Sequence, residues 1–152
     1  MDAVIIDVDG TLADVSGIRH YVRPGQIKGK NFDKFHEESV NCPANAWVVD
    51  MAKEAHNEGK AVIIVTARKH KWRHVTAWFL AMNDIPSDML IMRNDNDQRK
   101  DYEVKKDILS SIRSQGFNVV HAIDDNPSII RLWEENNIPV TPRGAGTGLA
   151  GG

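Results

Sequence analysis

The chain has 152 residues, of which 41% are hydrophobic and 26% charged, with a formal net charge of -2 at pH 7. This composition is that of a globular domain, and it excludes a broadly basic surface of the kind that coats nucleic acid, although not a local basic patch. The single cysteine excludes an internal disulfide, no apolar run approaches the roughly 20 residues of a membrane span, and early aspartates interrupt any signal-peptide pattern, so we expect a cytoplasmic protein.

Short apolar runs alternate with amphipathic segments along the chain. The runs predict strands at 3–7, 61–66, 88–93 and 119–124, with a weaker fifth at 138–141. Between them, apolar residues at helical spacing predict helices at about 44–56, 70–83, 102–114 and 127–136. Pro127 fits a first helical turn, and Gly59 and Gly116 stand where helices end. We assign Trp47, Trp78 and Trp133 to the apolar helix faces and hence to the core.

Buried strands that alternate with helices predict an α/β fold, namely a three-layer, Rossmann-like, doubly wound parallel sheet. Residues 12–43 interrupt the alternation, because they are rich in Gly and Pro and contain one short helical pattern at 33–39. We interpret them as a minimal cap or lid insertion over the site. A single domain is expected over 1–143, with 144–152 as a flexible tail.

Polar side chains follow the ends of four predicted strands. In an open parallel sheet these ends meet at one edge, near the point where the strand order reverses, and ligands bind there. Four converging sets of polar side chains therefore predict a site. They are Asp7 and Asp9 after the first strand, Thr66 and Arg68 after the second, Arg93 after the third, and Asp124 and Asp125 after the fourth.

The residue types at these ends indicate metal-assisted phosphoryl transfer. Asp7 and Asp9 face the same way in an extended segment, so they repel each other unless a cation lies between them. Asp124 and Asp125 add negative charge, which makes Mg²⁺ the economical explanation. The Thr66 hydroxyl and the ammonium of a lysine downstream suit a transferring phosphoryl group. The chain has no G-x-x-x-x-G-K-[ST] or G-x-G-x-x-G loop.

Four motifs resemble, in order, those of the haloacid dehalogenase superfamily of phosphatases: DVDGT (7–11), the Thr of VTAR (65–68), Lys105, and IDDN (123–126). The resemblance implies that Asp7 is the nucleophile that forms an aspartyl-phosphate. It implies that Asp9 is the general acid and then the base. Thr66 and Lys105 would hold the phosphoryl oxygens. Mg²⁺ would be held by the Asp7 carboxylate, the Asp9 carbonyl and Asp124. We expect Asp125 to contact a metal-bound water or to lie just outside the ligands, although which of Asp124 and Asp125 binds the metal directly stays open.

Three longer stretches are similar to the 3′-phosphatase domain of viral-type polynucleotide kinase/phosphatases: RKDYEVKKDIL (99–109), AIDDNPSIIRLW (122–133) and TARKHKWRHVTAWF (66–79). This likeness implies a DNA or RNA 3′ end as the substrate and a separate kinase or ligase as a partner, since these residues contain no kinase P-loop. It implies that the substrate phosphate is bound by Thr66, Ala67, Arg68, Arg99 and Lys105.

Alternatives stay open at this point. The substrate could be a small molecule such as a mononucleotide. A non-catalytic phospho-receiver module combines similar residues, but its phosphorylated aspartate ends the third strand, where this chain has Arg93. Lys106 competes with Lys105 for the motif position. His70 and His74 have a zinc-compatible spacing without an evident third ligand. The basic run 69–74 is either a solvated surface or a contact for strand phosphates, with Trp72 able to stack on a base.

Overall fold

The computed structural model describes residues 1–22 and 31–142, so the predicted tail at 144–152 and part of the 12–43 segment lie outside the described residues. One sheet of five strands runs in the order β3-β2-β1-β4-β5, and each neighbouring pair is parallel. The chain starts at the centre of the sheet with β1 and adds β2 and β3 outward on one side. It then crosses over to add β4 and β5 on the other side of β1. This arrangement confirms the doubly wound fold, with β1 at the switch point. The strands are β1 Asp2–Ile6, β2 Ala61–Lys69, β3 Met89–Arg93, β4 Asn118–Ile123 and β5 Val140–Thr141.

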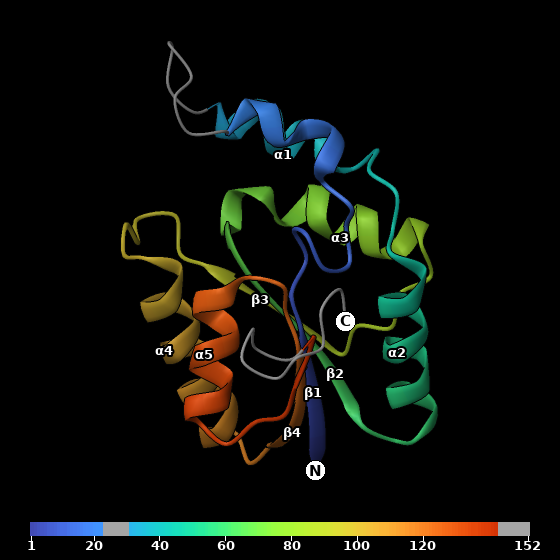
Figure 1. Ribbon diagram of the computed structural model, residues 1–152, viewed down its shortest axis with the longest axis vertical. Coiled ribbons are helices and arrows are strands. Elements are labelled where there is room, and N and C mark those ends of the chain that lie inside the picture. The colour runs from blue at the N-terminus through green and yellow to red at the C-terminus, as the bar shows by residue number, and fades with distance from the viewer. Residues whose placement is uncertain (23–30, 143–152) are drawn as a thin grey trace.

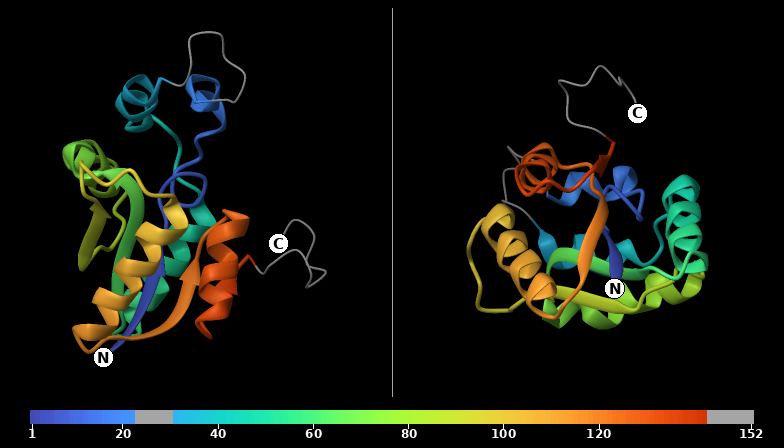
Figure 2. Two further views of the ribbon diagram at one scale, coloured as in Figure 1. Left: turned by 90° about the vertical axis from the view of Figure 1, so that its left-hand side faces the viewer. Right: turned by 90° about the horizontal axis from the view of Figure 1, so that it is seen from below.

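Helices cover both faces of the sheet and give it three layers (Figures 1 and 2). Because side chains alternate along β1, Ala3 and Ile5 join the core beneath α4 and α5, whereas Val4 and Ile6 join the core beneath α2 and α3. This alternation explains why the strand is apolar at every position. The covering helices are α2 Ala46–Asn57, α3 Arg73–Met82, α4 Asp101–Ser114 and α5 Pro127–Glu135, with a 3₁₀ turn, η2 His70–Trp72, before α3.

Three helix ends that were predicted from single residues agree with the structure, whereas α3 begins at Arg73, after η2, and not at about residue 70. Pro127 is the first residue of α5, where the Asn126 side chain caps the helix by accepting the Ser128 N–H at 3.1 Å. Gly59 and Gly116 follow α2 and α4 with positive φ angles of 82° and 92°. The residues that delimit these helices were therefore readable from local chemistry.

The assignment of three tryptophans to the core was wrong for two of them. Trp133 is 1% exposed, but Trp47 is 47% and Trp78 is 61% exposed. In α2 the buried face is formed by valines and alanines that begin one residue after Trp47, and in α3 Phe79 rather than Trp78 turns inward. One residue is a rotation of roughly 100° on a helix, which is enough to move a large ring from the core to the surface.

Part of the 12–43 segment lies beyond the carboxyl ends of the strands, as Figure 1 shows for α1. Its described helices are the 3₁₀ helix η1, Ser16–Tyr21, and α1, Phe32–Ser39. Residues Leu12, Ala13 and Val15, in contrast, are buried in the core beside α2, so the excursion from the sheet begins at about residue 16. Within the described ranges, no helix has the length and apolar character needed to cross a bilayer.

Candidate active site

Asp7 lies at the end of the central strand and is 9% exposed. Its backbone N–H continues the ladder to the Ile123 carbonyl at 3.0 Å, which fixes the side chain at the switch point. Lys105, from the second turn of α4, reaches this carboxylate. Its Nζ donates to Asp7 Oδ1 at 2.9 Å and to Asp124 Oδ2 at 2.8 Å. A buried ammonium therefore lies between two buried carboxylates.

The loop after β1 packs directly against Asp125. Gly10 has a φ of +79°, and a Cβ there would lie 2.5 Å from Asp125 Oδ2, so both the backbone conformation and the space require glycine. The Thr11 hydroxyl lies 3.5 Å from Asp7 Oδ2 and 3.3 Å from Asp125 Oδ1. Gly10 and Thr11 both belong to the DVDGT motif, but the sequence alone assigned neither of them a role.

Asp9 makes a two-point ion pair with Arg68. Arg68 Nε donates to Asp9 Oδ2 at 2.9 Å and Nη2 donates to Oδ1, while Nη1 donates to the Thr76 hydroxyl at 3.0 Å. Burial alone would raise the pKa of Asp9, but the charge and hydrogen bonds of Arg68 outweigh it and hold this pKa below its usual value. The carboxylate of Asp9 is thus ionised and held away from Asp7.

Asp7 has the opposite electrostatic environment. Burial and the neighbouring charge of Asp124 raise the pKa of Asp7 to about 8, although the positive charge of Lys105 acts against them. Burial and Asp124 also raise the pKa of Asp125. A single ammonium does not neutralise this group of carboxylates.

The same crowding provides the donor set for a metal ion. Among the described residues, Asp7, Asp124 and Asp125 form the group whose carboxylate oxygens lie within 4.8 Å of one another. Three carboxylates against the one ammonium of Lys105 leave negative charge for a divalent cation to neutralise. The donors are all oxygens, which suit a hard ion such as Mg²⁺. His70 and His74 belong to no such group within the described residues.

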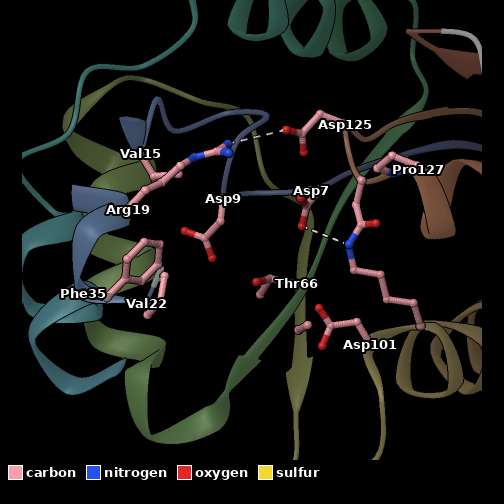
Figure 3. A pocket seen from close by; sticks show the side chains of 13 residues that line it. Asp7, Asp9, Val15, Arg19, Val22, Phe35, Thr66, Asp101, Asp125 and Pro127 are labelled. Carbon is pink, nitrogen blue, oxygen red and sulfur yellow. Dashed lines mark hydrogen bonds and ion pairs between the residues drawn. The ribbon is translucent and has the colours of Figure 1, made fainter. Parts of the chain in front are cut away.

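A cavity of about 650 Å³ opens over these carboxylates, and Figure 3 looks into it. Thr66 and Ala67 line it from the end of β2, and Thr66 is 1% exposed. The opposite wall comes from the segment that includes η1 and α1, with apolar Phe35 and the cation Arg19. Arg19 Nη2 lies 3.9 Å from Asp125 Oδ2. Arg19 was missed from the sequence, because no periodic pattern or motif marks which residue of this segment turns toward the sheet.

Three arginines predicted at the site, Arg68, Arg93 and Arg99, do not line this cavity. The exposed guanidinium of Arg99 pairs with Asp97 at 2.8 Å and with Asp107 at 2.6 Å. Arg93 is buried, and it donates to the Ala67 carbonyl at 2.9 Å, so it fixes the end of β2 that carries Ala67. Lys106 is exposed on α4.

Comparisons with known proteins agree with this geometry. Residues 1–145 match the family described as the polynucleotide kinase PNKP phosphatase domain. A putative bifunctional polynucleotide kinase/RNA ligase of Autographa californica nuclear polyhedrosis virus is 27% identical over 139 residues, covering 90% of this chain and 18% of the viral protein. A chain of the Pnkp1/Rnl/Hen1 RNA repair complex is 28% identical with a TM-score of 0.78, covering 95% of this chain and 43% of that one.

The class C acid phosphatase from Bacillus anthracis, solved with tungstate bound, shares the fold with a TM-score of 0.66 at 19% identity, covering 84% of this chain and 52% of that one. The chain spans less than half the length of the first two relatives. The family match nevertheless extends over nearly all of its residues. The chain belongs to the family of polynucleotide kinase phosphatase domains, within the haloacid dehalogenase superfamily, and it is a phosphomonoester hydrolase.

Proposed function

We propose that this chain removes 3′-phosphates from nucleic-acid ends, with Mg²⁺ as cofactor and an aspartyl-phosphate on Asp7 as the intermediate. The observation that carries the proposal is the position of Asp7. Its carboxylate ends the central strand, contacts Lys105 at 2.9 Å, lies within an acidic metal-binding group, and faces the cavity. A nucleophile must be exposed to substrate and balanced by positive charge, and Asp7 meets both conditions.

The chain's own residues divide the chemistry as follows. A carboxylate oxygen of Asp7 attacks the phosphorus, and the bond from phosphorus to the leaving oxygen breaks. Lys105 and Thr66 hold the phosphoryl oxygens. Asp9 gives its proton to the leaving oxygen and later takes a proton from the water that hydrolyses the aspartyl-phosphate. When bound at Asp7, Asp124 and Asp125, Mg²⁺ supplies positive charge that offsets the developing negative charge.

Asp9 must carry a proton to act as the general acid, and its ion pair with Arg68 opposes this. The Arg68 ion pair lowers the pKa of Asp9, so without substrate Asp9 carries no proton to donate. A phosphate dianion bound at Asp7 adds negative charge to the cavity that Asp9 also lines, and this raises the pKa of Asp9 again. Arg68 thus sets the protonation of the general acid from beside the cavity, whose lining does not include it.

The nucleic-acid substrate is supported by the family match and by the relatives. The family is that of the polynucleotide kinase phosphatase domain, and the relatives are a putative kinase/RNA ligase and a component of an RNA repair complex. In end repair, one enzyme removes the terminal phosphate so that a second enzyme can act on the same nucleic-acid end. We therefore propose a kinase or a ligase as the partner of this chain.

The test compares turnover of a 3′-phosphorylated oligonucleotide, its 5′-phosphorylated counterpart and free mononucleotides. We expect the 3′-phosphorylated oligonucleotide to have the highest kcat/KM and Asp7→Asn to abolish its hydrolysis. Asp50→Asn, an exposed position on α2, is the matched control and should retain full activity. Preference for mononucleotides would move the function to small-molecule phosphates, and activity that survives Asp7→Asn would contradict the covalent mechanism.

A further inference from the structure

A second cavity of about 480 Å³ lies beside the active-site cavity. Most of its lining comes from three segments: α1, the end of β2 with η2, and the loop that follows β3. The two cavities share part of their lining, so they adjoin. The shared residues are Asp9, Val22, Phe35, Ala67 and Asp101. A ligand whose phosphate lies at Asp7 can therefore extend from one cavity into the other.

Aromatic rings line this second cavity, which we call the side groove. Trp72 is half-buried, and its ring centroid lies 5.4 Å from that of His36 at an interplanar angle of 41°. Trp72 comes from η2 and His36 from α1, so the pair joins two segments far apart in the sequence. Aromatic faces of this kind hold nucleobases by stacking, whatever the base.

His36 adds a polar atom without a partner. It is 9% exposed, and its Nδ1 has no hydrogen-bond partner within the described residues. Burial and the charge of Arg68 lower the pKa of His36 to about 4, so the ring is neutral at pH 7. An unpaired buried nitrogen is unfavourable in the free protein, and the heteroatoms of a base are potential partners for it.

The cations of the side groove suit a strand backbone. Lys69 lines the groove and makes no ion pair with the described residues. Lys71, also in the lining, lies over the Trp72 ring at 5.3 Å and pairs with Asp33 only at 3.5 Å, in an exposed contact that a phosphodiester can replace. Arg73, in contrast, donates to the Leu90 carbonyl and is absent from the lining. Only part of the basic run 69–74 therefore faces the groove.

We propose that the side groove binds the terminal nucleotide of a single-stranded 3′ end, with its base against Trp72 and His36 and the adjoining phosphodiester near Lys69. This inference rests on the proposed function, because it takes the terminal phosphate to lie at Asp7. It adds a determinant of substrate choice, since a phosphate ester without a base would leave the groove empty.

The test measures binding of a 3′-phosphorylated oligonucleotide in an Asp7→Asn background, which prevents turnover. Trp72→Ala should raise the Kd roughly 5- to 150-fold, the range expected for the loss of one stacked base. Trp72→Phe, which retains a ring, should restore most of the affinity. Trp78→Ala removes an exposed tryptophan outside the groove and should leave the Kd unchanged.

An oligonucleotide that lacks only its terminal base completes the design. It should bind more weakly than the intact strand, and Trp72→Ala should then cause no further loss. An equal loss from Trp72→Ala on intact and abasic strands would overturn the groove assignment. If the wild-type enzyme instead prefers mononucleotides to 3′-phosphorylated strands, the proposed function fails, whichever result Trp72→Ala gives.

Discussion

Lys105→Met tests the electrostatic balance of the site. The substitution keeps a side chain of similar length but removes the ammonium that contacts Asp7 at 2.9 Å and Asp124 at 2.8 Å. Removing one partner of a buried ion pair costs about 3–5 kcal/mol of unfolding free energy. At about 2–4 °C per kcal/mol for a chain of this size, the melting temperature should fall by roughly 6–20 °C at pH 7 in a chelator.

The pH dependence of this effect has a definite sign. The pKa of Asp7 is raised from 3.8 to about 8, so between these values the native state binds more protons than the unfolded state and stability falls as pH rises. Above about pH 8, Asp7 is deprotonated in both states of the wild-type protein, so its effect on the free energy of unfolding no longer changes with pH. Lys105 lowers the pKa of Asp7, so this pKa rises further in Lys105→Met. The stability of the variant therefore continues to fall as the pH rises above 8. The deficit of Lys105→Met should therefore widen from pH 7 to pH 9.

Thermal unfolding followed by circular dichroism at pH 7 and pH 9 measures this deficit. Lys106→Met is the matched control, because Lys106 is the exposed neighbour on the same helix and its loss should change stability by less than about 0.5 kcal/mol. Added Mg²⁺ should narrow the deficit, since it neutralises the same carboxylates. Equal stability of the two variants at both pH values would refute the placement of Lys105 between the carboxyl groups of Asp7 and Asp124.

Three further outcomes are expected. Asp9→Asn should abolish steady-state turnover but leave slow phosphorylation of Asp7, which rapid-quench measurements detect; undiminished turnover would exclude Asp9 as the general acid. Activity should be lost in a chelator, return with Mg²⁺ and be inhibited by Ca²⁺, whose larger and looser oxygen shell favours bidentate carboxylates; full turnover in the chelator rules out the metal. Gly10→Ala should destabilise the protein by about 1–3 kcal/mol in denaturant titrations, because its φ is +79° and the added Cβ meets Asp125; wild-type stability would show that this loop relaxes freely.

Most of the fold could be predicted because its strands are buried on both faces. Such strands give continuous apolar runs, and α5 adds the local signal of Pro127 at its start. The helix faces were harder, because an apolar pattern in α2 fits two overlapping faces. Trp47 and Val48 are adjacent, and only packing against the sheet decides that Val48 turns inward. The large size of a side chain such as Trp47 therefore does not show that it is buried.

Part of the candidate site could likewise be predicted from the sequence, and part could not. A parallel sheet collects the ends of its strands at one edge, so Asp7, Thr66 and Asp124 were expected together from order alone. The contributions of Arg19 and His36 were not predictable, because they depend on how η1 and α1 approach the sheet. The Arg68 ion pair with Asp9 is likewise tertiary, since its two partners lie 59 residues apart.

A rapid-quench experiment can detect the covalent intermediate on Asp7 itself. A 3′ end carrying a radiolabelled terminal phosphate is mixed with Mg²⁺ and either the wild-type enzyme or Asp9→Asn, and the protein is then digested and mapped. We expect label on the peptide that contains Asp7, transient in the wild type and accumulating in Asp9→Asn, with none in Asp7→Asn. Phosphate release without labelled protein at any time, or label on a different residue, would contradict the covalent step at Asp7.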